Sequence, residues 1–346
     1  MDVADGEGGR EGAAKAGFAA DLLAWYDAHA RVLPWRIPPG GPAPDPYRVW
    51  LSEVMLQQTT VATVRPRYER FLGLFPTVAA LAEAPLDAVL AEWAGLGYYA
   101  RARNLHACAQ VVAREGWPRT EAGLRALPGL GAYAAASVAA IAFGERAVVV
   151  DGNVERVVAR VFAVEAPVRR AAREVRALAD ALTPEARPGD YAQAMMDLGA
   201  VACRPRSPDC LLCPVRGHCD AAARGLTDEL PVRTPKKPRP VRRGTVYVGR
   251  RGDGAVLCER RPPAGLYGGM AGLPGSAWGE GAVLAPPVEA EWREAGVVTH
   301  GLTHFVLELT VYAGAVEAAP EGTFFLGADA LDALPTVFRA CVEAAR

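Results

Sequence analysis

Four closely spaced cysteines constrain the fold of this chain more than any other feature of its sequence. They follow the spacing C-x6-C-x2-C-x5-C, and they are Cys203, Cys210, Cys213 and Cys219. Such a cluster indicates a metal site rather than disulfides, which are rare in the cytosol. Tetrahedral zinc and a [4Fe–4S] cluster both use four thiolates, and the spacing alone leaves both open.

The composition is that of a globular protein with about two domains. The chain has 346 residues, of which 51% are hydrophobic and 22% are charged, and these values exclude wholesale disorder. The net charge of −1 conceals an asymmetry, because Pro231–Arg251 holds eight basic residues and no acidic one, whereas residues 252–346 hold twelve acidic and five basic residues. Any affinity for nucleic acid must therefore come from local placement of charge.

The residue pattern divides the chain into four parts. Residues 1–16 are expected to form a disordered tail, and residues 17–224 a helical domain that includes the cysteine loop at 203–219. Apolar residues recur at helical spacing in this domain, for example at Trp50, Val54 and Val61. Four prolines and many charges predict an extended linker over residues 225–243.

Residues 244–346 are predicted to form a second, α+β domain. Short β-rich runs lie at Thr245–Val248, Ala255–Cys258, Val297–Thr299 and Phe305–Tyr312. The longest uncharged run, Ala126–Gly144, is interpreted as a buried helix rather than a membrane span, because proline and glycine crowd its start. No secretory signal is visible, so we expect no membrane association and a cytoplasmic location.

A glycine-containing turn, Leu127-Pro128-Gly129-Leu130-Gly131, precedes an apolar helix. The two glycines let the backbone turn tightly, and the N–H groups at the start of the next helix can bind a phosphate. Leu127, Gly129 and Gly131 are therefore candidate phosphate contacts, and a plain interhelical turn is the alternative.

The hairpin, Asp151 and the four-cysteine loop occur in the order found in the helix-hairpin-helix DNA glycosylases of the endonuclease III superfamily, which the chain resembles. The resemblance implies a mostly α fold, a [4Fe–4S] cluster on the four cysteines and double-stranded DNA as partner. Members that also cleave the strand carry a lysine where this chain has Tyr133. A phenol cannot form an imine, and no lysine lies between Ala16 and Pro235, so the resemblance implies a monofunctional glycosylase that uses water.

Two carboxylates are candidates for the chemistry of base release. Glu53 has largely apolar neighbours on its helix, which predicts a desolvated carboxyl with a raised pKa and the role of general acid. The alternative is a glutamate that reaches solvent. Asp151 precedes a helix, so it is a helix N-cap or the ionised carboxylate that stabilises the sugar cation.

The resemblance is sharper to the adenine DNA glycosylase (MutY) family. Its motifs match Ser52–Thr59, Gly95–Arg101, Asp151–Val154 and Gln193–Gly199. It implies that Glu53 protonates adenine, that Asp151 stabilises or captures the sugar cation, and that Tyr133 and Asn153 line the pocket. It also implies DNA contacts by Gln57, Gln58, Thr59 and Tyr98, with Gln58 and Tyr98 entering the base stack. For Tyr98, a role as core filler is the alternative.

The C-terminal residues resemble the Nudix-like domain of the same family, which reads 8-oxoguanine opposite the adenine. The family's Phe-Ser-His loop corresponds to Leu302-Thr303-His304, where Leu302 replaces the aromatic residue. Recognition through Thr303 and His304 is therefore expected, and stacking by residue 302 is not. The glutamate pair that would hold Mg²⁺ after Trp292–Gly296 is missing, so nucleotide hydrolysis is not expected.

We therefore expect a monomeric adenine DNA glycosylase that acts on adenine mispaired with 8-oxoguanine or guanine and leaves an abasic site. An endonuclease III-like glycosylase for damaged or mispaired pyrimidines is the first alternative, and the absent lysine and the extra domain argue against it. A non-catalytic DNA-binding or redox protein is the second, and the two carboxylates argue against it.

Overall fold

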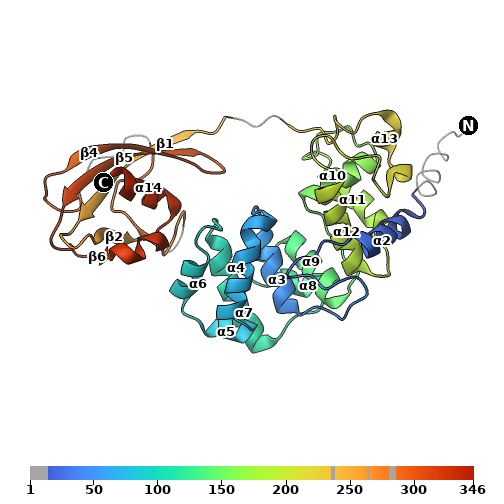
Figure 1. Ribbon diagram of the computed structural model, residues 1–346, viewed down its shortest axis with the longest axis horizontal. Coiled ribbons are helices and arrows are strands. Elements are labelled where there is room, and N and C mark those ends of the chain that lie inside the picture. Colours follow the sequence, from blue (N-terminus) through green and yellow to red (C-terminus); the bar gives the residue numbers. More distant parts are fainter. Residues whose placement is uncertain (1–14, 235–237, 263–264, 280–285) are drawn as a thin grey trace, which may run out of the picture. The chain divides into compact units, whose positions relative to one another are not determined.

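The computed structural model describes residues 15–234, 238–262, 265–279 and 286–346 (Figure 1). Apart from Lys15 and Ala16, the expected disordered tail lies outside the described residues, and so do residues 235–237 of the expected linker. Contacts between Cα atoms divide the chain into two units. Of the described residues, the first unit comprises 15–83 and 107–234, and the second comprises 84–106 and those from 238 onward.

The first unit consists of helices and their connections. Its helices are α2 (Phe18–His29), α3 (Pro46–Leu56), α4 (Val61–Leu74), α5 (Val78–Glu83), α8 (Glu121–Arg125), α9 (Ala132–Phe143), α10 (Gly152–Val161), α11 (Ala172–Leu182), α12 (Pro188–Val201) and α13 (Asp220–Arg224). A short 3-10 helix, Arg216–His218, lies in the cysteine loop, and α7 (Ala100–Glu115) runs from the second unit into the first.

Capping residues and a left-handed turn set the limits of α3. Asp45 accepts a hydrogen bond from the N–H of Tyr47 at 2.9 Å, and Pro46 occupies the first helical position. After α3, Gln58 adopts a positive φ of 58°, which interrupts the helix. The expectation that Val61 continues the run of Trp50 and Val54 is therefore wrong, because Val61 begins α4.

Helix α9 is the centre of the first unit. Gly129 turns the preceding hairpin with a φ of 75°, and Gly131 is the N-cap of α9. Most residues of α9 are small and buried, so α3, α8 and α12 pack closely around it. Among the described residues, no helix is long and apolar enough to cross a bilayer.

The second unit is built on a mixed six-stranded sheet (Figure 1). Its strands are β1 (Val241–Arg250), β2 (Val256–Arg260), β3 (Ala271–Gly272), β4 (Arg293–Gly301), β5 (Val306–Ala315) and β6 (Thr323–Leu326). Their order is β3-β2-β1-β5-β4, with β6 paired to β2. Strands β1 and β5 run parallel, and the other strand pairs among the described residues are antiparallel.

Helix α14 (Thr336–Ala344) covers the sheet through contacts with β1, β4 and β5. Its buried Phe338 joins Val246, Leu307 and Leu309 in the core of the unit. The unit also holds α6 (Leu86–Glu92) and a 3-10 helix, Ala328–Ala333.

The predicted fold class, mostly α with a C-terminal α+β part, is confirmed. Each predicted β segment overlaps a strand, whereas β3 and β6 were not predicted. The contacts also assign residues 84–106, which the sequence pattern groups with the helical domain, to the second unit.

Candidate active site

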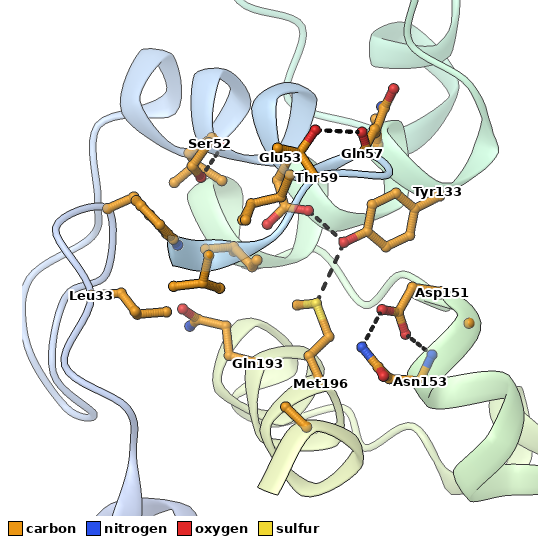
Figure 2. A pocket seen from close by; sticks show the side chains of 18 of the residues that line it. Leu33, Ser52, Glu53, Gln57, Thr59, Tyr133, Asp151, Asn153, Gln193 and Met196 are labelled. Carbon is orange, nitrogen blue, oxygen red and sulfur yellow. Dashed lines mark hydrogen bonds between the residues drawn. The ribbon is translucent and has the colours of Figure 1, made fainter. Parts of the chain in front are cut away.

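A cavity of about 730 Å³ in the first unit is lined by residues of α3, α9, α10 and α12 (Figure 2). Of the residues expected in the site, it is lined by Glu53, Gln57, Gln58, Thr59, Gly131, Tyr133, Asp151 and Asn153. The two carboxylates, far apart in the sequence, therefore share one cavity.

Glu53 projects from α3 and is buried, with 5% of its surface exposed. The hydroxyl of Tyr133 donates a hydrogen bond to its Oε2 over 2.6 Å (Figure 2). Burial raises the pKa of Glu53, and the bond from Tyr133 and the charge of Arg36 oppose the shift only in part. The carboxyl group is thus suited to carry a proton into the cavity and to release it there.

Tyr133 is the second residue of α9 and lies between Glu53 and α12. Its hydroxyl is also 3.4 Å from Sδ of Met196. Burial, and next the negative charge of Glu53, raise the pKa of Tyr133 well above its usual range. The phenol therefore stays neutral and acts as a hydrogen-bond donor.

Asp151 is the N-cap of α10, as one of the two interpretations of the sequence expects. Its Oδ1 accepts hydrogen bonds from the N–H groups of Asn153 and Val154, at 2.9 and 2.7 Å. Its Oδ2 accepts one from Nδ2 of Asn153 at 3.0 Å (Figure 2). The positive end of the α10 dipole suits an anion at this position, and the cap fixes the carboxylate at the edge of the cavity.

Arg156, which was not predicted as part of the site, holds the Asn153 side chain in place. Its guanidinium is buried and donates Nη2–H to Oδ1 of Asn153 at 2.9 Å and to the carbonyl of Gly199 at 2.7 Å. Its Nε donates to the carbonyl of Cys203 at 2.8 Å. The Asn153 amide is thus oriented by a residue that also contacts the cysteine loop.

A second group missed from the sequence is the ion-pair cluster of Asp197, Arg31 and Arg36. Asp197 is fully buried in α12, and its two oxygens pair with Arg31 Nε and Arg36 Nη1, each at 2.6 Å. Both arginines line the cavity. Asp197 lies in the motif Gln193–Gly199, but nothing in the spacing links that motif to arginines about 160 residues earlier.

The residues expected to enter the base stack have strained backbones. Gln58 and Tyr98 both adopt positive φ, of 58° and 48°, which few residues other than glycine do. Gln58 lines the cavity, whereas Tyr98 lies in the second unit. The Tyr98 side chain is partly open to solvent, with 48% of its surface exposed. The hydroxyls of Tyr98 and Thr303 form a hydrogen bond within that unit.

Four other residues predicted to contact DNA do not line the cavity. Leu127 and Gly129 lie in the hairpin before α9, whose first turn has no side-chain cap and so leaves N–H groups available. Thr303 and His304 lie between β4 and β5 in the second unit, and both are exposed.

The four clustered cysteines line one small cavity next to α10, together with Arg160. Burial, and to a lesser degree the neighbouring thiols, raise the pKa of Cys213 to about 11. Nη1 of Arg160 lies 3.2 Å from Sγ of Cys203, and its buried Nη2 has no partner among the described residues.

Four sulfur donors beside an unsatisfied guanidinium fit an anionic metal–thiolate group. In the described part of the chain, no group of three or more His, Cys, Asp or Glu side chains is placed to hold a single metal ion, so the four thiols suit a group larger than one ion.

Comparison with known proteins identifies a family for the helical part of the chain and another for its C-terminal part. Residues 51–185 match the HhH-GPD superfamily of base excision DNA repair proteins, and residues 245–344 match the NUDIX domain. The adenine DNA glycosylase of Mus musculus is 35% identical over an alignment of 377 positions, which covers 88% of this chain and 72% of the mouse protein. That of Homo sapiens is 45% identical over 226 residues, which cover 62% of this chain but only 41% of the human protein.

Solved structures agree on the fold. A thermostable thymine-DNA glycosylase superposes with a TM-score of 0.54 at 27% identity, over 61% of this chain and 98% of that one. Endonuclease III in a non-covalent DNA complex superposes with a TM-score of 0.51 at 22% identity, over 62% of this chain and 98% of that one, which supports the fold alone. With its helical HhH-GPD region, its NUDIX region and its mouse relative aligned over most of both lengths, the chain belongs to the adenine DNA glycosylase family.

Proposed function

We propose that the protein is a monofunctional adenine DNA glycosylase, which removes adenine mispaired with 8-oxoguanine or guanine in double-stranded DNA and leaves an abasic site. The observation that carries this proposal is the shared cavity of Glu53 and Asp151. One carboxyl group is buried and protonated more readily than usual, and the other is held by three hydrogen bonds at a helix N-terminus.

In the proposed reaction, the adenine leaves the base stack and enters the cavity. Glu53 donates its proton to a ring nitrogen of the adenine, which makes the base a better leaving group. As the N-glycosidic bond breaks, both bonding electrons go to the base, and positive charge develops on the sugar.

Asp151 then stabilises the sugar cation by its negative charge or bonds to it, and water completes the hydrolysis. The bonds from Asn153 and Val154 hold Asp151 in place, so little reorganisation is needed as the charge develops. Tyr133 orients the Glu53 carboxyl through the 2.6 Å hydrogen bond.

The surroundings of Lys15 support a hydrolytic mechanism without an amine adduct. Lys15 is the one lysine among the described residues. Its Nζ donates to the carbonyls of Val161 and His218 and to Asp220, at 3.1, 2.6 and 2.8 Å. These partners belong to the end of α10, to the cysteine loop and to the start of α13, and none of them lines the cavity.

We propose that the uncapped start of α9 binds a DNA phosphate, that Gln58 and Tyr98 support the distorted duplex, and that Thr303 and His304 read the base opposite the adenine. Cys203, Cys210, Cys213 and Cys219 are proposed to hold a [4Fe–4S] cluster. When bound, this cluster supplies a rigid, anionic anchor for the cysteine loop, and the chemistry of base release needs only the chain's own residues.

Adenine release from a duplex with one A·8-oxoguanine pair, followed by alkali that cleaves abasic sites, tests the proposal. We expect a strand break only after alkali, and slower release from an A·G duplex. Release of oxidised pyrimidines in preference to adenine would support the endonuclease III-like alternative. Strand cleavage before alkali, with an adduct trapped by borohydride, would contradict the monofunctional mechanism.

A further inference from the structure

The turn between β4 and β5 presents two polar residues and anchors two apolar ones. Leu302 and Phe305 pack against the core of the second unit, and the Leu302 N–H donates to the Phe305 carbonyl at 2.9 Å. Thr303 and His304, which lie between them, are exposed. We call residues 301–305 the recognition loop.

Arg239, from the segment before β1, holds one side of this loop. Its Nη1 donates to the Leu302 carbonyl at 2.8 Å. In addition, the Val306 N–H donates to the Pro240 carbonyl at 2.9 Å. The segment before β1 is therefore hydrogen-bonded to residues at both ends of the turn.

Arg242 holds the other side. Its guanidinium lies over the ring of Phe305, 4.3 Å from the ring centroid. This distance is typical of a cation–π contact. Arg242 belongs to β1, which pairs with β5 in parallel from Val241 opposite Val306 onward. Both arginines thus contact the residues that flank the exposed pair.

We propose that Arg239 and Arg242 are positioning residues for the recognition loop, and that they set the preference for 8-oxoguanine over guanine opposite the adenine. This inference rests on the proposed function. An exposed turn loses conformational freedom when it binds, and that cost falls when the turn is already held in its binding geometry. Because only contacts that distinguish the two bases depend on this geometry, the arginines act on discrimination rather than on general DNA affinity.

The test compares Arg239→Ala and Arg242→Ala with the unchanged protein. Single-turnover adenine release is measured on two duplexes that differ only in 8-oxoguanine or guanine opposite the adenine. We expect the ratio of the two rates to fall about three- to fivefold in each variant, from the size of one hydrogen bond or one cation–π contact. Arg239→Lys keeps a donor for the Leu302 carbonyl, so we expect its ratio of rates to lie close to that of the unchanged protein.

Arg251→Ala is the matched control. The Arg251 guanidinium lies 4.4 Å from the ring centroid of Phe325, so this variant removes the same kind of contact from the same unit. Phe325 lies on β6, which pairs with β2 and not with the strands of the recognition loop. We expect its ratio to equal that of the unchanged protein, and thermal unfolding of all variants to show intact folding.

Two results would overturn the inference. Unchanged ratios in both alanine variants would mean that the loop needs no support. An equal loss on both duplexes, with a weaker salt dependence of binding, would mean that the arginines contact phosphates instead. Failure of the proposed function is distinguishable from both, because the unchanged protein would then release no adenine from either duplex.

Discussion

At the residue scale, the site depends on two carboxyl groups with different surroundings. Glu53 is buried beside Tyr133, whereas Asp151 is fixed by N–H donors at the start of α10. Both features follow from local sequence: apolar neighbours on α3 predict the first, and a helix start predicts the second. Their meeting in one cavity could not be derived from spacing, because it depends on how α3, α9 and α10 pack.

Glu53→Gln is expected to stabilise the fold at neutral pH while it impairs base release. The pKa of Glu53 is raised in the folded protein, so its contribution to stability is full below the unfolded pKa of about 4.5 and is lost as pH rises through the folded pKa. The variant should therefore unfold at a higher temperature than the unchanged protein at pH 8, and the difference should shrink towards pH 4. Thermal unfolding across this range measures it, and an equal difference at both ends would contradict the burial argument.

Tyr133→Phe is expected to shift the pH dependence of base release. The lost hydrogen bond favours the ionised form of Glu53, so its removal raises the pKa of Glu53 further. Because the protonated form is the active one in the proposed reaction, the decline in single-turnover rate at high pH should move to higher pH. The stability cost is about 1 kcal/mol. A shift to lower pH would exclude the assigned role of the phenol.

At the scale of single elements, α10 joins the cavity to the cysteine loop. Asp151 caps its start, Arg156 contacts both Asn153 and Cys203, and Arg160 lies against the Cys203 sulfur. Side chains four residues apart lie on one face of a helix, so a single rigid element carries all these contacts.

Arg156→Gln is expected to weaken the fold and slow base release together. Its guanidinium makes hydrogen bonds that a glutamine is too short to keep, so carbonyls of Cys203 and Gly199 lose their donors. The expected loss is about 2–4 kcal/mol in the free energy of unfolding. Denaturant unfolding and single-turnover release check it. Arg156→Lys, which keeps the positive charge but not the set of guanidinium hydrogen bonds, is the control, and unchanged stability and release there would show that these hydrogen bonds are not the cause.

Helix and strand limits show where sequence patterns fail at this scale. The break between α3 and α4 rests on the left-handed Gln58, which no turn-forming residue type announces. The two-residue β3 and the partly exposed β6 are too short to show alternation, whereas the longer β1 and β5 were predicted.

At the scale of the whole molecule, the residue patterns along the chain predicted a helical region followed by an α+β region. They did not predict which distant segments contact one another. The helical and β-rich patterns indicate separate regions correctly. Nothing in residues 84–106 indicates their contacts in the second unit, such as that of Arg103 with the Gly268 carbonyl at 2.7 Å. Such long-range pairs depend on surface fit, which periodicity does not describe.

The proposed cluster gives a test at this scale. The purified protein is expected to be brown, with broad visible absorbance, and about four iron atoms per chain. Cys210→Ser should lose both the colour and the iron and should unfold at a lower temperature. Cys108→Ala, which changes an isolated buried cysteine, should keep both. A colourless protein that contains zinc would contradict the iron–sulfur assignment and leave the four-cysteine site intact.

The division of labour between Glu53 and Asp151 is tested most directly by single-turnover adenine release from an A·8-oxoguanine duplex. The comparison includes Glu53→Gln and Asp151→Asn, because asparagine caps a helix as well as aspartate does and so leaves α10 in place. This division of labour predicts that each variant binds the duplex like the unchanged protein but releases adenine on the order of 10²- to 10⁴-fold more slowly. Release at the unchanged rate by either variant would contradict it.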